Sequence, residues 1–160
     1  MAKMIDELQA RLDKEFKEAE HELKVVLPKE IRKATDMGDL SENAEYKAAL
    51  ERQEFLKARL EQLLKRLQEL SMLNINRLPR DRVAFGTWMN VFDVEKEEEQ
   101  EFTLVMPEDA DLKQGLISTS SPLGRGFIGK SEGDEVCIET PGGARNFEIL
   151  ELKTIHDQEE

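Results

Sequence analysis

The sequence predicts an α+β protein, with an N-terminal antiparallel α-helical coiled-coil hairpin followed by a C-terminal antiparallel β domain. Two observations predict this organisation. Residues 5–26 and 49–70 carry apolar side chains at helical, heptad-like spacing, which is typical of two helices packed along one seam. Beyond residue 77, apolar and polar side chains alternate as they do in strands. We therefore expect two domains, residues 1–76 and 77–160.

The first predicted helix has apolar residues at spacings of three and four, a pattern typical of one buried helical face. These residues are Ile5, Leu8, Leu12, Phe16, Ala19, Leu23 and Val26. Pro28 lacks the backbone N–H that an interior helical residue donates. We therefore expect a kink or a break near Leu27.

The second predicted helix repeats this pattern, and its apolar positions are Ala49, Leu56, Leu60, Leu63, Leu67 and Leu70. A short turn containing Gly38 joins two stripes of similar length, so the helices should fold back on each other. At about 1.5 Å per residue, about thirty residues make an arm of roughly 45 Å. Such an arm buries only its seam, so its length indicates a role beyond stability.

Five alternating segments predict the strands of the C-terminal domain. They are residues 82–94, 100–106, 116–120, 135–140 and 145–152. Gly142 and Gly143 supply the turn of the last predicted hairpin, because glycine adopts positive φ without steric cost. The acidic residues 95–99 are expected to form a solvated loop.

Cysteine, histidine and apolar content exclude several classes of protein. Cys137 is the only cysteine, so no internal disulfide can form, and its apolar neighbours predict a buried strand position. His21 and His156 lie far apart in the sequence, which argues against a histidine metal site or a catalytic triad. There is no run of about 18 apolar residues, and the N-terminus turns acidic at Asp6. We expect a cytoplasmic protein without a membrane partner.

The net charge of −12 argues against free duplex DNA as the main partner, because binding to a polyanion depends on Lys and Arg contacts with phosphates. The charge is uneven. Residues 1–76 carry a net charge of −2 and residues 77–160 a net charge of −10. The first segment could therefore approach a nucleic acid, and the second would resist doing so.

Two acidic residues stand in the predicted turn between the helices, in the segment Gly38-Asp39-Leu40-Ser41-Glu42-Asn43-Ala44-Glu45-Tyr46. Asp39 and Glu42 have the Asp-x-x-Glu spacing of a helix capping box. They equally fit a pair of carboxylates presented at the end of a long arm, where they could help to bind Mg²⁺. The residues alone leave both interpretations open.

This segment resembles the Gly-Asp-Leu-x-Glu-Asn-Ala-Glu-Tyr signature of the Gre family, GreA type, the bacterial transcript cleavage factors that enter RNA polymerase through its secondary channel. The resemblance covers almost the whole chain and implies an FKBP-like C-terminal domain. It implies that Asp39 and Glu42 help the polymerase to hold a second Mg²⁺ ion and to orient the attacking water. Two carboxylates cannot hold Mg²⁺ tightly, so we expect no cofactor bound by this chain alone.

The resemblance assigns further residues around this turn. Those expected to shape the tip are Gly38, Leu40, Asn43, Glu45 and Tyr46. The candidate contacts with the nascent RNA 3′ end or the channel wall are Arg32, Lys33, Lys47 and Arg52, although ordinary solvated helix faces explain these basic residues equally well.

Residues 124–131 match the P-loop pattern G-x-x-x-x-G-K-[ST]. A P-loop needs a helix directly after it, and the residues after Lys130 have the pattern of a strand, so we expect no nucleotide binding. The segment resembles instead the C-terminal domain of the Gre family, in which Ser121 and Pro122 lie where the domain contacts polymerase at the channel rim.

The predicted function is therefore that of a monomeric accessory factor, not an enzyme, that stimulates cleavage of backtracked nascent RNA by bacterial RNA polymerase. One alternative is a channel-binding inhibitor, which would have no need of the acids Asp39 and Glu42. Another is a prolyl isomerase, since a fold does not carry its function along. The aromatic residues that would line its proline pocket are few: Phe85, Trp88, Phe92, Phe102, Phe127 and Phe147.

Overall fold

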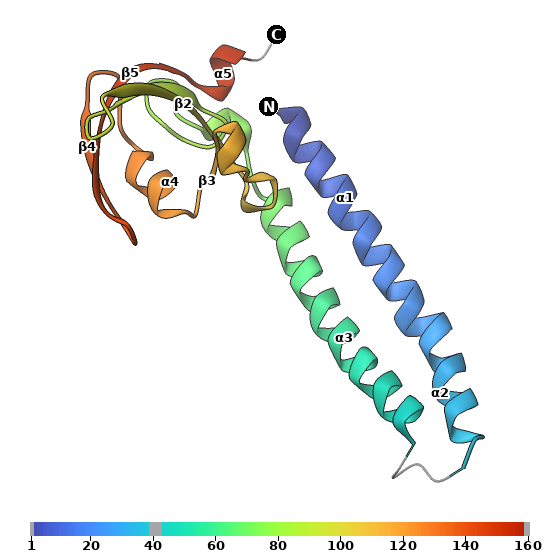
Figure 1. Ribbon diagram of the computed structural model, residues 1–160. Helices are drawn as coiled ribbons and strands as arrows, with labels where there is room; N and C mark the ends of the chain where they lie inside the picture. Colours follow the sequence, from blue (N-terminus) through green and yellow to red (C-terminus); the bar gives the residue numbers. More distant parts are fainter. Residues whose placement is uncertain (1, 39–42, 159–160) are drawn as a thin grey trace. The chain divides into compact units, whose positions relative to one another are not determined.

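The structure, a computed structural model, describes residues 2–38 and 43–158. Within these residues the chain forms two compact units, Lys3–Leu73 and a second that begins at Asn74. The first unit is helical and the second contains the sheet (Figure 1). The predicted order of a helical hairpin followed by a β domain is confirmed.

The helical unit is a hairpin of two antiparallel arms. The first arm consists of α1 (Ala2–His21), the π-helical turn η1 (Glu22–Val26) and α2 (Leu27–Thr35), and the second is α3 (Ala44–Ser71). Figure 1 shows the two arms side by side. The buried residues of α3 follow one another at intervals of one heptad, which confirms the predicted seam: Ala49, Leu56, Leu63 and Leu70.

The first arm is irregular just before Pro28. In the π-helical turn the Leu27 N–H donates to the Glu22 carbonyl, five residues back instead of the four of an α-helix. The helix nevertheless continues, because both Val26 and Leu27 keep right-handed helical angles. An interior proline crowds the carbonyl four residues before it. We attribute the wider turn to Pro28, so the expected kink or break near Leu27 is replaced by a π-helical turn.

The π-helical turn shifts the buried stripe of the first arm by one residue. Val26 is 37% exposed, whereas Leu27 is fully buried, so the predicted place of Val26 in the stripe is wrong. One additional residue within the turn explains the change. The buried residues that show this shift from seven-residue spacing are Ile5, Leu12, Ala19, Leu27 and Ala34.

The C-terminal unit is a five-stranded sheet with the order β3-β2-β1-β5-β4. Its strands are β1 (Trp88–Asp93), β2 (Glu98–Val105), β3 (Leu116–Ser118), β4 (Glu135–Thr140) and β5 (Gly143–Lys153). The predicted antiparallel pairing holds for β1, β2, β4 and β5. β3 instead runs parallel to β2, because the chain between them crosses back before β3 begins.

Short helical segments complete this unit. The crossover from β2 to β3 contains the 3₁₀ turns η3 (Pro107–Asp109) and η4 (Leu112–Gln114). Helix α4 (Pro122–Phe127) follows β3, α5 (Ile155–Gln158) follows β5, and the 3₁₀ turn η2 (Ile75–Arg77) precedes β1. Figure 1 shows the sheet curling around α4. The predicted likeness to the FKBP fold stays a prediction.

Four of the five predicted strands have limits that differ from those observed, and only β4 agrees at both ends. The strand predicted for residues 82–94 begins only at Trp88, because a turn at Phe85 and Gly86 precedes it and Gly86 has a φ of 81°. Glu98 opposes Asp93 in the β1–β2 ladder. The loop predicted for residues 95–99 is therefore shorter, since its last two residues belong to β2.

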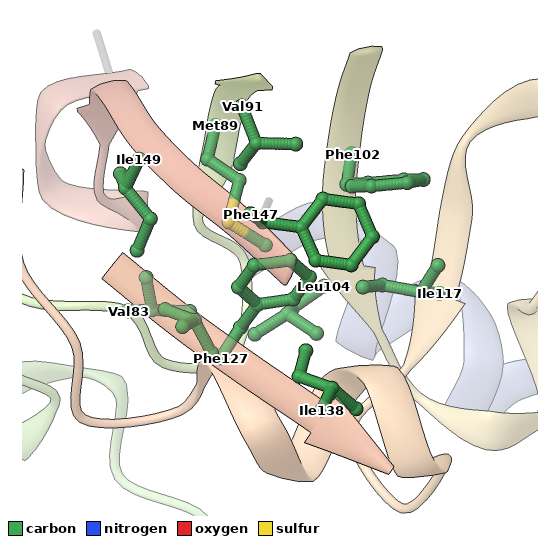
Figure 2. Close-up of a cluster of buried hydrophobic side chains, with 11 residues drawn as sticks. Val83, Met89, Val91, Phe102, Leu104, Ile117, Phe127, Ile138, Phe147 and Ile149 are labelled. Atoms are coloured by element: carbon green, nitrogen blue, oxygen red, sulfur yellow. The ribbon is translucent and has the colours of Figure 1, made fainter. Parts of the chain in front are cut away.

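The core of this unit is formed by apolar side chains on one face of the sheet (Figure 2). Three aromatic rings lie at its centre, with centroids 5.2 to 6.3 Å apart: Phe102, Phe127 and Phe147. Phe127 is the last residue of α4 and is fully buried. Its ring therefore anchors this short helix to the sheet.

Cys137 lies on the face of β4 that points away from this core. Its neighbours Val136 and Ile138 are 4% and 3% exposed, and successive residues of a strand point to opposite faces. Cys137 is accordingly exposed. The prediction of a buried cysteine is wrong, because its apolar neighbours occupy the inner face.

Candidate functional site

The acidic signature connects α2 to α3 at the end of the hairpin. Gly38, its first residue, has a φ of +125°, and a Cβ there would meet nothing within 4 Å. Glycine is therefore favoured at this position by the backbone angle and not by a lack of space. Asp39, Leu40 and Glu42 lie outside the described residues, so their roles remain predictions.

Asn43 forms the N-cap of α3. Its Oδ1 accepts the Tyr46 N–H at 3.0 Å, which is the bond that defines an N-cap. Its Nδ2 donates to the Ala34 carbonyl oxygen of α2 at 2.7 Å. Of the other residues predicted to shape the tip, Glu45 is exposed and Tyr46 is half-buried.

The position of this N-cap tests the interpretation of Asp39 and Glu42 as a capping box for the helix that follows them. A capping box built from Asp39 and Glu42 would place the helix start at residue 40, whereas α3 begins at Ala44. The capping interpretation of the two acids is therefore wrong for α3. The N-cap of α3 is Asn43, and the roles of the two acids stay predictions.

Arg52 differs from the other basic residues predicted to contact RNA or the channel wall. Its guanidinium donates to the Glu22 carboxylate of the first arm at 2.7 and 2.8 Å and lies 5.1 Å from the Phe55 ring centroid. The hydrogen bond lowers the pKa of Glu22 and raises the pKa of Arg52. Arg52 thus joins the two arms and is not a free cation. The remaining candidates are exposed: Arg32, Lys33 and Lys47.

A groove of about 390 Å³ lies between α2 and α3 near the tip. Its rim carries two acidic and two basic side chains, and its remaining lining is alanine. The residues that line it are Glu30, Lys33, Ala34, Glu45, Ala48, Ala49 and Arg52. The structure therefore brings Lys33 and Arg52 together, but in a setting without an excess of positive charge.

Ser121 and Pro122, the predicted docking residues, begin helix α4. The Ser121 Oγ accepts the Gly124 N–H at 3.0 Å and donates to the Ser118 carbonyl oxygen at 2.7 Å. Pro122 follows in the first turn, where no backbone N–H is needed. Both residues line an apolar pocket of about 370 Å³. The rest of its lining is Ala110, Leu112, Leu116, Ile117, Ser118, Leu123, Thr140, Pro141 and Arg145.

Arg145, beside this pocket, forms an ion pair with the buried Asp93, and this pair was not predicted from the sequence. Arg145 donates to Asp93 at 2.6 Å, and the Asp93 side chain is fully buried and also accepts the Lys96 N–H at 3.2 Å. Burial alone would raise the pKa of Asp93, but the hydrogen bonds from Arg145 and Lys96 outweigh it and hold the pKa below its usual value. The overlooked signal is a charged residue at an inward position of both β1 and β5.

The glycine-rich segment does not form a P-loop. Its first half lies in α4, which ends at Phe127, and residues 129–134 form turns that lead into β4. A P-loop cradles phosphate at the start of a helix that follows the lysine. No helix follows Lys130 before β4, so this geometry is not present.

Among the helices of residues 2–38 and 43–158, none is both long and apolar enough to cross a membrane. Within the same ranges, no three His, Cys, Asp or Glu side chains gather closely enough to hold a metal ion.

Both units match one family of known proteins. Residues 3–71 match the N-terminal region of the transcription elongation factors GreA and GreB, and residues 78–154 match their C-terminal region. The chain belongs to the GreA/GreB family. It is 42% identical over 142 residues to transcription elongation factor GreA of Nitratiruptor sp.. This aligned region covers 89% of this chain and 86% of that protein. It is 43% identical over 124 residues to GreA of Thermodesulfovibrio yellowstonii, covering 78% of each chain.

Solved structures of GreA/GreB relatives are also similar to this chain. The transcription elongation factor GreA/GreB of Nitrosomonas europaea is 28% identical and aligns with 54% of this chain and 74% of its own, with a TM-score of 0.41. The GreA factor homolog 1 of Thermus thermophilus is 21% identical and aligns with 90% and 93%, also with a TM-score of 0.41.

Proposed function

We propose that this GreA/GreB-family elongation factor binds bacterial RNA polymerase, stimulates the polymerase's own cleavage of backtracked nascent RNA, and so releases arrested complexes. The observation that carries this proposal is that both units of the chain match the family. The hairpin adds support, because residues 39–42 connect α2 to α3 at the end of a long helical arm. An arm of this kind suits delivery of side chains into a narrow channel.

In this proposal the C-terminal unit docks on the polymerase at the rim of its secondary channel. The support is the apolar pocket lined by Ser121 and Pro122. Leu112 on its edge is 68% exposed, and covering such a side chain with a partner removes apolar surface from water, which favours association. The first unit then enters the channel and reaches the RNA 3′ end.

Asp39 and Glu42 carry the chemistry of this proposal by binding the second Mg²⁺ ion of the polymerase and orienting the attacking water. That ion, when bound, stabilises charge on the attacking and leaving oxygens of an in-line displacement. Two carboxylates supply too few of the six oxygen ligands that Mg²⁺ prefers. The chain is therefore an accessory factor with no tight Mg²⁺ site of its own, and the polymerase performs the cleavage.

The two alternatives have less support. A prolyl isomerase needs aromatic side chains around an open pocket, but Phe102, Phe127 and Phe147 lie in the core. The residues described around the apolar pocket include no aromatic side chain. An inhibitor that only occupies the channel has no need of Asp39 and Glu42.

The test is cleavage of 3′-labelled RNA in a stalled elongation complex, followed on a gel. The Asp39→Asn and Glu42→Gln variants should compete with the parent protein for polymerase, yet stimulate cleavage at least about tenfold less, as expected when a metal site is disturbed. Raised Mg²⁺ should restore part of the activity. Glu51→Gln, which removes the same charge from an exposed position of α3, is the matched control and should behave like the parent. Normal cleavage by the acid variants, or none by the parent, would refute the proposal.

A further inference from the structure

Asn43 is held by hydrogen bonds at both ends of its side-chain amide. Its Oδ1 accepts the Tyr46 N–H at 3.0 Å, and its Nδ2 donates to the Ala34 carbonyl oxygen at 2.7 Å. The first bond satisfies a free N–H at the start of α3, and the second gives the Ala34 carbonyl of α2 a further donor beside the Met37 N–H at 3.1 Å. One side chain thus joins the last turn of one helix to the first turn of the next.

The two bonds are not equally specific to asparagine. Capping needs only an acceptor, which aspartate and serine also provide. The bond to Ala34 needs an N–H donor that reaches back nine residues along the chain, and among the common N-cap residues only asparagine has an amide NH₂. The identity of residue 43 is therefore determined by the bond that crosses between the helices.

This bond joins α2 to α3 on either side of the segment that carries the acidic signature. The chain leaves α2 through Gly38, whose φ of +125° is a conformation that other residues rarely adopt. It enters α3 at Asn43, whose φ and ψ are −84° and 103°. A segment whose two ends are held has less conformational freedom to lose when its side chains engage a ligand.

We propose that Asn43 is a positioning residue, whose bond to Ala34 fixes the chain ends from which Asp39 and Glu42 are presented to the polymerase. The proposal rests on the proposed function for its effect on cleavage. It assigns no metal ligand or proton transfer to Asn43. A residue that only caps α3 would leave the cleavage rate unchanged when another capping residue replaces it.

Two variants separate the bridging bond from the cap. Asn43→Ser keeps a capping hydroxyl without changing charge, and its side chain is too short to reach Ala34. Asn43→Asp keeps the size and the acceptor, but turns a carboxylate oxygen toward the Ala34 carbonyl oxygen. The matched control is Asn74→Ser, because Asn74 caps the 3₁₀ turn η2 through the Asn76 N–H at 3.0 Å, a bond within its own turn.

The experiment uses the full chain and stalled elongation complexes. Both Asn43 variants should compete with the parent for polymerase and melt within a few degrees of it. Their maximal cleavage rate should fall on the order of tenfold, because small misplacements of reacting groups are costly. Raised Mg²⁺ should narrow the difference, and Asn74→Ser should match the parent. Rates equal to the parent for both Asn43 variants would overturn the proposal.

A second measurement keeps this test separate from that of the proposed function. Amide hydrogen exchange of the free protein should accelerate in residues 35–38 and 43 of the Asn43→Ser variant, and not in Asn74→Ser. If the parent stimulates no cleavage, the proposed function fails and the exchange data still decide whether Asn43 fixes the segment ends. Unchanged exchange in Asn43→Ser would show that the bond to Ala34 does not hold these ends.

Discussion

Replacing Arg145 with methionine tests the buried ion pair beside the apolar pocket. Methionine keeps much of the length of the side chain and its contact with the Phe147 ring, but removes the guanidinium that donates to Asp93 at 2.6 Å. Asp93, with no exposed side-chain surface, would keep only the Lys96 N–H at 3.2 Å. Removing one partner of a buried pair typically costs about 3–5 kcal/mol. Because Arg145 is 28% exposed, we expect the lower end, about 3 kcal/mol.

The contribution of Asp93 to the free energy of unfolding should change with pH in opposite directions in the parent and in the Arg145→Met variant. In the parent, the lowered pKa of Asp93 means that the pair contributes fully above the unfolded pKa of about 3.9. That contribution is lost as the pH falls through the folded pKa. Without Arg145, burial should raise the pKa of Asp93, so protonation relieves an unpaired buried charge. The variant should therefore gain stability relative to the parent as the pH falls from about 7 toward 4.

Urea unfolding followed by tryptophan fluorescence is the assay, because Trp88 is the only tryptophan and lies on β1. Arg82→Met is the control, since its pair with Asp81 is exposed and should contribute less than about 1 kcal/mol. Adding Asp93→Asn to Arg145→Met should recover much of the loss. A loss below about 1 kcal/mol, with the pH profile of the parent, would refute the inference that the pair is buried and coupled.

Two further predictions address each unit in turn. Phe127→Ala should lower the free energy of unfolding of the C-terminal unit, reported by Trp88 fluorescence, by about 3–5 kcal/mol. The unfolding transition of the hairpin, followed by circular dichroism, should stay in place. Equal shifts of both transitions would contradict the expectation that the two units unfold independently. Deleting Val25 together with Pro28→Ala restores seven-residue spacing of the buried residues and removes the proline ring from the helix. The free energy of unfolding of the hairpin, followed by its helical signal, should therefore rise by about 1–3 kcal/mol. A lower melting temperature of the helical signal would show that the buried stripe of the hairpin does not need uninterrupted seven-residue spacing.

The parts of the fold that depend on a repeating pattern could be predicted from the sequence. The heptad positions of α3, such as Leu56 and Leu63, are buried as expected, because one face of a long helix must be covered along its whole length. The strand β4 could be placed at its observed limits, because the short apolar run Val136-Cys137-Ile138 lies between polar residues and the turn-forming Gly133 and Pro141.

The features that were missed depend on contacts between distant segments. Composition marks Cys137 as apolar, but only the pairing of β4 decides which of its two faces meets the core. The direction of β3 depends on how the chain crosses back after β2, which no local pattern encodes. Asp93 and Arg145 are 52 residues apart, so their pairing becomes apparent only when β1 and β5 are aligned.

The candidate site could be predicted only in part. The acids Asp39 and Glu42 were recognised from a signature, and the residue that holds the ends of their segment, Asn43, was noted only as part of it. Its bond to Ala34 could not be inferred, because a helix C-terminus and the next N-cap come together only in the folded hairpin. The pairing of Arg52 with Glu22 was not predicted either, because these residues are 30 positions apart and meet only when the two arms fold together.

The π-helical turn has a consequence for how relatives of this protein should be aligned and compared. It accommodates one residue more than a regular helix between Ala19 and Leu27, so the length of the first arm and the presence of Pro28 are linked. A relative without the proline can keep the same seam with one residue fewer. Single-residue gaps should therefore occur in this stretch, and their occurrence should correlate with the loss of the proline among homologous sequences.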